Sequence, residues 1–306
     1  MSSASPVPSG PSSSGSSCSG PSFSTTSGCS SSGSPGSSAV PRAASVAPVV
    51  SALRAAGCVF AEDEARLLVS AARTPGELAA MVERRVAGLP LEHVLGWAEF
   101  CGLRIAVGPG VFVPRRRTEF LAREAAALGH ALGRPGAVVV DLCCGSGAVG
   151  AFLAAALDRP VLHAADIDPS AVACARRNLA AADGDVHVHE GDLYDPLPAG
   201  LRGRVDVLVA NVPYVPSDAV ALLPPEARDH EPRVALDGGA DGLDVLRRVA
   251  AAAPEWLAPG GRLLFETGEE QAPAAVAAVA RAGLEARVAV SEELYATVVI
   301  ASAPTA

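Results

Sequence analysis

The stretch Val205-Asp-Val-Leu-Val-Ala-Asn-Val-Pro-Tyr214 is an apolar run of strand length that ends abruptly in a polar and aromatic cluster. Residues 205–210 are mostly β-branched or small, which is typical of a parallel strand covered on both faces. Pro213 cannot donate to a sheet ladder and biases Val212 towards an extended conformation. We therefore expect Asn211 at the carboxyl end of a buried parallel strand, the edge at which open α/β sheets bind ligands.

The residues after this strand can bind a planar NH2 group. The Asn211 side-chain oxygen accepts one hydrogen bond, and the carbonyl of Val212, freed by Pro213, can accept another. Tyr214 adds a flat face against which a planar amide or a base can stack. The alternative is a strand end closed by an asparagine-containing turn, which is common, and these four residues by themselves do not decide between the two.

Length, composition and charge narrow the class of protein. The 306 residues suffice for a small domain plus a larger one, and 49% are hydrophobic. The formal net charge is −9 and the chain has no lysine, which counts against a surface built for nucleic acid. No apolar run reaches the roughly 18 residues of a membrane span, and the N-terminus lacks the regions of a signal peptide. We expect a cytoplasmic protein that acts without a membrane.

The seven cysteines suit reduced thiols, because they form no C-x-x-C pair and show no spacing typical of zinc ligands. No metal site is expected. Cys143 and Cys144 are neighbours, and small semi-polar residues in a tight turn are a better interpretation than a redox pair.

Composition divides the chain into four parts. Residues 1–45 are rich in Ser, Gly and Pro and predict a disordered tail. Residues 46–90 carry apolar positions at helical spacing and predict a bundle of three short helices, which either only packs or orients a substrate. Residues 91–117 contain an alternating segment around Gly102, which predicts a β-hairpin linker. Residues 118–303 alternate strands with helices, as in a parallel α/β sheet.

Two groups of charged residues have an ordinary interpretation. Arg115, Arg116 and Arg117 are typical of a solvated face, although they can also attract an acidic partner. His230 and Glu231 could act as a general acid and a general base, but we favour a role in a solvated loop or as a support for a substrate loop.

A second informative stretch is Ala137-Val-Val-Val-Asp-Leu-Cys-Cys-Gly-Ser-Gly-Ala-Val-Gly150, which predicts a buried strand, a sharp turn and a helix. It lacks the G-x-G-x-x-G fingerprint of dinucleotide sites, and Asp141 can meet a cationic amine at the strand end. Asp166 ends the next strand about twenty residues further on, where doubly wound folds place a ribose-binding acid. A ligand with a positively charged amino acid end and a ribose fits both carboxylates, and S-adenosylmethionine has both.

Four motifs together resemble class I S-adenosylmethionine-dependent methyltransferases whose target is a planar nitrogen: Asp141-Leu-Cys-Cys-Gly-Ser-Gly147, Asp166, Gly191-Asp192 and Asn211-Val-Pro-Tyr214. Three longer stretches resemble the protein N5-glutamine methyltransferases that modify peptide chain release factors. They are Leu91-Glu-His-Val-Leu-Gly-Trp-Ala-Glu-Phe100, Pro114-Arg-x-x-Thr-Glu119 and Glu231-Pro-Arg-Val-Ala-Leu-Asp-Gly-Gly-Ala-Asp-Gly-Leu243. The resemblance implies a Rossmann-like, mostly parallel seven-stranded sheet with a small N-terminal helical domain.

The same resemblance implies the cofactor S-adenosylmethionine and roles for individual residues. Asp166 would bind the ribose hydroxyls, Asp192 and Leu193 would border the adenine, and the turn after Asp141 would wrap the methionine part. The implied cofactor-binding residues are Asp141, Cys143, Cys144, Gly145, Ser146, Gly147, Asp166, Ile167, Asp192, Leu193 and Asn211. The implied catalytic residues are Asn211, Val212, Pro213 and Tyr214.

The implied substrate is a glutamine in the Gly-Gly-Gln loop of a peptide chain release factor, modified by a monomeric enzyme that does not bind nucleic acid directly. Most relatives carry Asn-Pro-Pro-Tyr, whereas position 212 is Val here. Because the inferred contact uses the backbone carbonyl, this difference is compatible with binding. The turn also carries Cys143 and Cys144 where Gly and Thr are more usual.

Two other classes of function compete with this one. An adenine-N6 methyltransferase acting on DNA or RNA would use the same Asn-x-Pro-Tyr site after base flipping, but the acidic charge counts against it. A non-catalytic cofactor-binding protein is the second alternative, and the intact Asn211 and Tyr214 count against that.

A chain that begins near Val46 should fold and turn over like the full chain, because the composition of residues 1–45 supports no core. Circular dichroism and turnover of the shortened and full-length proteins check this. Loss of folding or of activity on truncation would contradict the predicted disorder.

Overall fold

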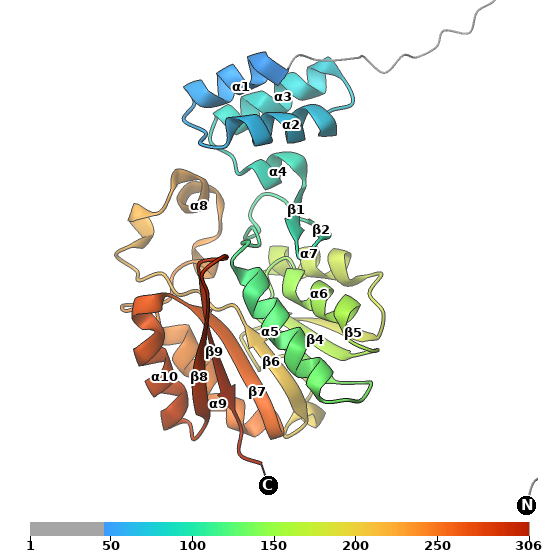
Figure 1. Ribbon diagram of the computed structural model, residues 1–306, viewed down its shortest axis with the longest axis vertical. Helices are drawn as coiled ribbons and strands as arrows, with labels where there is room; N and C mark the ends of the chain where they lie inside the picture. The colour runs from blue at the N-terminus through green and yellow to red at the C-terminus, as the bar shows by residue number, and fades with distance from the viewer. Residues whose placement is uncertain (1–45, 306) are drawn as a thin grey trace, which may run out of the picture. The chain divides into compact units, whose positions relative to one another are not determined.

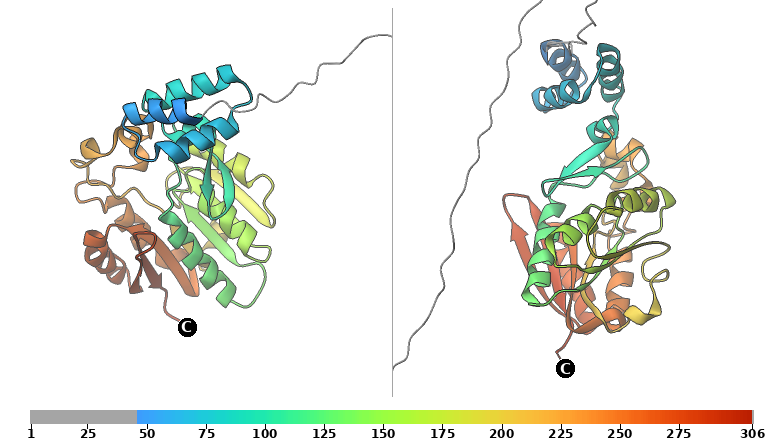
Figure 2. Two further views of the ribbon diagram at one scale, coloured as in Figure 1. Left: turned by 45° about the horizontal axis from the view of Figure 1, so that its top comes forward. Right: turned by 90° about the vertical axis from the view of Figure 1, so that its right-hand side faces the viewer.

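The computed structural model describes residues 46–305, so the tail predicted over residues 1–45 lies outside the described residues. Three helices follow, as the apolar spacing predicts: α1 (Val46–Ala55), α2 (Ala61–Ala71) and α3 (Pro75–Val86). They lie side by side in every view (Figures 1 and 2) and bury a shared cluster that includes Leu53 and Leu68. Thr74 starts α3 by accepting a hydrogen bond from the Glu77 backbone N–H.

A short helix and a hairpin occupy the range predicted as a linker. The hairpin pairs β1 (Trp97–Phe100) with β2 (Leu103–Ala106), as predicted. Helix α4 (Leu91–Leu95) before it is not predicted, because five residues are too few for a periodic signal. Gly96 ends α4 with a φ of 81°, a conformation that favours glycine.

The central sheet has seven strands: β3 (Val138–Leu142), β4 (Val161–Asp166), β5 (Asp185–Glu190), β6 (Val205–Ala210), β7 (Leu257–Thr267), β8 (Glu285–Ser291) and β9 (Ala296–Ser302). Their order is β5-β4-β3-β6-β7-β9-β8. Neighbouring strands from β5 to β7 are parallel, and β9 runs antiparallel to both β7 and β8. The predicted mostly parallel seven-stranded sheet is confirmed.

Helices cover both faces of this sheet (Figure 1). Helices α5 (Thr118–Ala131), α6 (Ala148–Ala156) and α7 (Pro169–Leu179) pack on one face, where Val207 and Val209 of β6 point. Helices α9 (Asp244–Trp256) and α10 (Ala272–Arg281) pack on the other, against Leu208 and Ala210. Every residue of β6 is buried, which explains its unbroken apolar run. None of the helices within residues 46–305 combines the length and the hydrophobicity that a bilayer crossing requires.

Strand order places a crevice at the centre of the sheet. The chain moves outward from β3 through β4 to β5, and then crosses back to place β6 on the other side of β3. The loops after β3 and β6 therefore leave the sheet in opposite directions. Open α/β sheets bind ligands at such a reversal, beyond the carboxyl ends of the strands.

Three histidines stack on the edge strand β5 and its neighbour β4. His163 of β4 pairs in register with His187 of β5, with ring centroids 4.7 Å apart. The His163 Nδ1 lies 2.9 Å from the Nε2 of His189, so one of the two nitrogens donates a hydrogen bond to the other. Asp185 pairs with His187 at 2.9 Å. Burial, then His187 and Arg176, lower the pKa of His189. Burial, followed by the neighbouring His187 and His189, lowers the pKa of His163 to about 4.

The histidine stack should make the protein less stable in mild acid. His163 has a lower pKa in the folded chain than in the unfolded chain, so its stabilising contribution is complete above about pH 6.5 and is lost as the pH falls towards 4. Between pH 7.5 and pH 5 we expect the free energy of unfolding to fall by about 1–2 kcal/mol from this group.

Urea unfolding at both pH values, compared with a His163→Gln variant, measures this contribution. The variant should lose less stability on acidification than the parent. An equal loss in the two proteins would show that other groups cause the pH dependence.

Candidate active site

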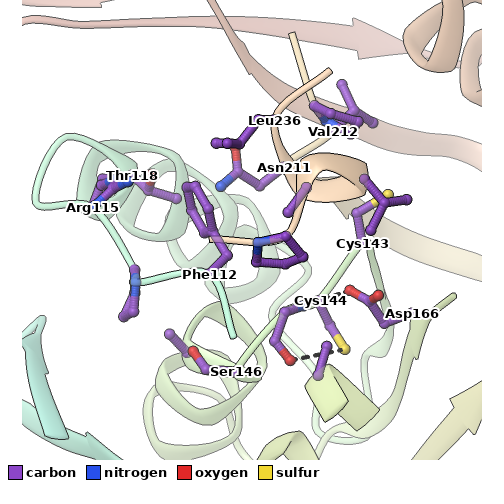
Figure 3. Close-up of a pocket in the computed structure, with 18 of the residues that line it drawn as sticks. Phe112, Arg115, Thr118, Cys143, Cys144, Ser146, Asp166, Asn211, Val212 and Leu236 are labelled. Atoms are coloured by element: carbon purple, nitrogen blue, oxygen red, sulfur yellow. Dashed lines mark hydrogen bonds between the residues drawn. The ribbon is translucent and has the colours of Figure 1, made fainter. Parts of the chain in front are cut away.

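A cavity of about 520 Å³ lies at the carboxyl ends of β3, β4 and β6. In Figure 3, Asp166 and Cys143 lie on one side of it, Phe112, Arg115 and Thr118 lie on the other, and Asn211 lies between the two groups. Eleven of the fourteen different residues singled out from the sequence line it: Asp141, Cys143, Cys144, Gly145, Ser146, Asp166, Ile167, Asn211, Val212, Pro213 and Tyr214. Gly147, Asp192 and Leu193 do not line it.

The carboxylate of Asp141 lies beneath the glycine turn. It is 1% exposed and accepts a hydrogen bond of 2.9 Å from the Gly150 backbone N–H at the start of α6. Burial raises its pKa to about 7, and the charge of Asp166 acts in the same direction. A carboxyl group in this position would be held in its ionised form by a cation placed beside it.

Asp166 organises the backbone of the turn. Its two oxygens accept hydrogen bonds from the N–H groups of Gly145 at 2.8 Å and Asp168 at 2.9 Å. Burial raises the pKa of this carboxyl group as well. A carboxylate has about four lone-pair sites, so Asp166 can accept further hydrogen bonds from a ligand.

The two neighbouring cysteines belong to the turn itself. Cys143 has a φ of 54°, a conformation that is uncommon outside glycine. Burial raises the pKa of both thiols, Cys143 and Cys144, so both stay protonated at neutral pH. This environment favours the interpretation as small packing residues over a reactive pair.

The three predicted residues outside the cavity have other contacts. Gly147 starts α6 with a φ of 76°, and a Cβ there would lie 3.0 Å from the Ala175 side chain. Asp192 forms an ion pair of 2.6 Å with Arg248 of α9. Leu193 is buried in the apolar cluster on that face of the sheet. Asp192 is nevertheless close enough to Cys143 to influence its thiol.

The side-chain oxygen of Asn211 is a hydrogen-bond acceptor without a donor among the described residues. It is buried, and no group within residues 46–305 donates a hydrogen bond to it. Buried polar atoms are nearly always paired, and an unpaired one costs about 1–3 kcal/mol. Such an atom at the edge of a cavity indicates that its partner comes from a ligand.

A buried carboxylate holds the first arginine of the cluster. The Glu231 side chain is completely buried and pairs with Arg115 at 2.5 Å. It also accepts a hydrogen bond of 3.2 Å from the Val113 backbone N–H. Burial raises the pKa of Glu231, and Arg115 partly offsets the rise. Glu231 therefore supports the loop before α5, and the expectation of a solvated face is wrong for Arg115.

A second buried carboxylate, Glu266 at the end of β7, was not identified from the sequence. It accepts hydrogen bonds from the hydroxyl groups of Thr118 at 2.7 Å and Tyr214 at 3.0 Å. It also pairs with the Nε of Arg117 at 2.8 Å, and Arg117 donates a further hydrogen bond to the Tyr214 hydroxyl. The signal that could have revealed it is an acidic residue at the carboxyl end of a predicted apolar strand.

Sequence reasoning also missed the far wall of the cavity. This wall comes from the loop before α5 and from the segment around α8 (Pro225–His230), and includes Phe112, Leu223, Glu226, Val234 and Leu236. Both segments contain stretches already quoted for their resemblance to a family, which was the available signal. The wall is mostly apolar, as ligand sites usually are.

The site thus combines two kinds of groups. Asp141 and Asp166, with the exposed backbone of the turn, suit a ligand that carries an amine and hydroxyl groups. Asn211 and Tyr214 suit a second, planar group that donates hydrogen bonds. The arrangement can hold two molecules side by side and orient one towards the other.

Comparison with known proteins supports a group-transfer enzyme. Residues 104–222 match the model of the "Methyltransferase small domain" family. The chain is 41% identical over 213 residues to a release factor glutamine methyltransferase of Geobacter sulfurreducens, covering 68% of this chain and 72% of that one. It is 41% identical over 207 residues to the same enzyme of Mycolicibacterium smegmatis, covering 67% and 72%.

The comparison with solved structures includes one protein of the same description. The release factor-specific protein-(glutamine-N5) methyltransferase of Alicyclobacillus acidocaldarius is 25% identical, with a TM-score of 0.40, over 65% of this chain and 98% of that one. The two sequence relatives are the stronger comparison, because they combine higher identity with long coverage.

Proposed function

Because this chain belongs to the release factor glutamine methyltransferase family, we propose that it methylates the side-chain nitrogen of a glutamine in a peptide chain release factor. The chain is a class I S-adenosylmethionine-dependent methyltransferase, as its sheet and its relatives together show. The modified residue would lie in the Gly-Gly-Gln loop of the release factor.

The unpaired oxygen of Asn211 is the observation that carries this proposal. A primary amide presents two N–H groups in one plane. Asn211 would accept one of them and the backbone carbonyl of Val212 the other. Tyr214 lines the same cavity and would stack against the amide plane. A side-chain hydroxyl or carboxylate substrate could not supply both donors.

The chain's residues fit the cofactor that the family uses. Asp166 would accept hydrogen bonds from the ribose hydroxyls and Asp141 would face the charged amino acid end, while Asp192 and Leu193 would border the adenine. Gly145 has open space where a Cβ would lie, so a ligand can approach the backbone of the turn. When bound, the cofactor supplies an electrophilic methyl group.

Catalysis would come mainly from orientation. An amide nitrogen is a poor nucleophile because its lone pair is delocalised, so it must be aimed at the methyl group. Holding both N–H groups through Asn211 and Val212 favours a pyramidal nitrogen and an in-line approach. No general base is needed before transfer, because the methylated amide is strongly acidic and loses its proton afterwards.

We also propose that the enzyme works in the cytoplasm as a monomer and does not bind nucleic acid directly. The net charge of −9 supports the last point. The proposed domains are a helical domain over residues 46–90, a hairpin linker over 91–117 and a methyltransferase domain over 118–303. Adenine methylation is not favoured.

Asp166→Ala should weaken cofactor binding by about 1–3 kcal/mol, because both the proposed ribose contacts and the bond to Gly145 are lost. Calorimetry measures the affinity. Asp192→Ala is the matched comparison and should have a smaller effect, since Arg248 already occupies that carboxylate. Unchanged affinity in the Asp166 variant would refute the assignment.

Asn211→Ala should reduce turnover about a hundredfold while changing cofactor affinity little, because a misplaced nucleophile reacts slowly. Purified enzyme is incubated with labelled cofactor and either a release factor or duplex DNA, and the label is mapped by mass spectrometry. Label on a release factor glutamine, lost in the variant, is the expected result. Label on adenine and none on glutamine would establish the competing function.

A further inference from the structure

The carboxylate of Glu266 lies beside the site but is not part of the proposed chemistry. Its side chain is 3% exposed, at the carboxyl end of β7. Ala210 of β6 pairs with Phe265 of β7, so Glu266 and Asn211 are the next residues along two neighbouring strands. A buried carboxylate is costly unless it is paired, so its partners show what it stabilises.

All three partners of Glu266 belong to the walls of the cavity. Arg117 and Thr118 come from the start of α5, and Tyr214 comes from the loop after β6. Attachment of α5 to β7 needs only the first two contacts. The third contact, from the Tyr214 hydroxyl, concerns the site itself, because this ring lines the cavity next to Asn211.

The Tyr214 hydroxyl is held from two directions. It donates to Glu266 Oε1 at 3.0 Å and accepts a hydrogen bond from Arg117, whose guanidinium centre lies 5.3 Å from the ring centroid. Arg117 is in turn fixed by its ion pair with Glu266 at 2.8 Å. The ring is half-buried, so without these contacts it could turn towards solvent.

We propose that Glu266 is a positioning residue for methyl transfer, which fixes the Tyr214 ring as a preformed surface for the substrate amide. This inference rests on the proposed function. Because the ring is already ordered before the substrate binds, binding does not carry the entropic cost of ordering it. The main effect is therefore expected on substrate affinity. Glu266 acts through Tyr214 and does not touch the amide.

The test is a double-mutant cycle of Glu266→Gln and Tyr214→Phe. Glutamine keeps the size and one acceptor of Glu266 but removes the charge that fixes Arg117, and phenylalanine removes only the hydroxyl. Each single change should raise KM for the release factor about tenfold, as expected for one lost hydrogen bond to a charged group. kcat and the cofactor Kd should change less than about twofold.

The KM of the double variant should be no higher than that of the single variant with the higher KM, because both changes break the same contact. The proposal would be overturned if the two changes raised KM by independent factors that multiply in the double variant. It would also be overturned if Glu266→Gln had the same KM as the parent. An equal loss of cofactor affinity would also overturn it, since that would indicate general damage to the fold. Glu270→Gln, an exposed residue in the turn after β7, is the matched control and should leave all constants unchanged.

A measurement without substrate separates this proposal from the function on which it rests. The chain has three tyrosines, so NMR of tyrosine-labelled protein can follow the Tyr214 ring, assigned by its loss in Tyr214→Phe. The ring signal should shift and its flipping should speed up in Glu266→Gln, and an unchanged signal would refute the positioning role. If the parent enzyme labels no glutamine, the proposed function fails whatever the ring does.

Discussion

At the carboxyl edge of the parallel sheet, the backbone groups beyond the strand ends have no neighbouring strand to pair with. Most of the site follows from the groups that pair with them instead. Beyond β3, the Cys144 N–H bonds the carbonyl of Ala165, and the Gly145 N–H bonds the carboxylate of Asp166. Beyond β4, the Asp166 carbonyl accepts from Gly191. Backbone carbonyls of the neighbouring strand and one side-chain carboxylate thus pair these N–H groups, because buried backbone groups must be paired. The loop after β6 differs, since Pro213 has no N–H to pair and the Asn211 oxygen is left free.

Buried carboxylates also govern the electrostatics of the far wall. Glu231 and Glu266 each lie almost completely out of solvent and each hold one arginine of the loop before α5. Two of three adjacent, partly exposed arginines are therefore paired with carboxylates that lie inside the protein, where an unpaired charge would be costly. The wall is fixed in shape and carries little net charge from these pairs. Such a wall suits a neutral amide better than a phosphate, in line with the charge of the whole chain.

The sequence predicted the parts of the site that depend on local pattern. Pro213 marks the end of β6 and so locates Asn211, and Asp141 and Asp166 end apolar runs that are plainly strands. Contacts between distant segments were not predictable. Glu231 and Glu266 bind partners 116 and 148 residues away, so no spacing links them. The histidine stack was missed because it requires the register between β4 and β5. The ion pair between Asp192 and Arg248 was also not predictable, because the two residues are distant in the sequence and Arg248 belongs to α9.

At position 211, the stability of the folded protein and the proposed activity favour different side chains. An apolar side chain of similar size would relieve the cost of an unpaired buried acceptor and stabilise the empty protein. It would also remove the acceptor that we propose for the substrate amide. A search for heat-resistant variants that scores folding alone would therefore favour replacement of this residue and discard catalysis. If the proposed role is right, asparagine at this position favours the substrate-bound state of the protein at a cost to the stability of the empty one.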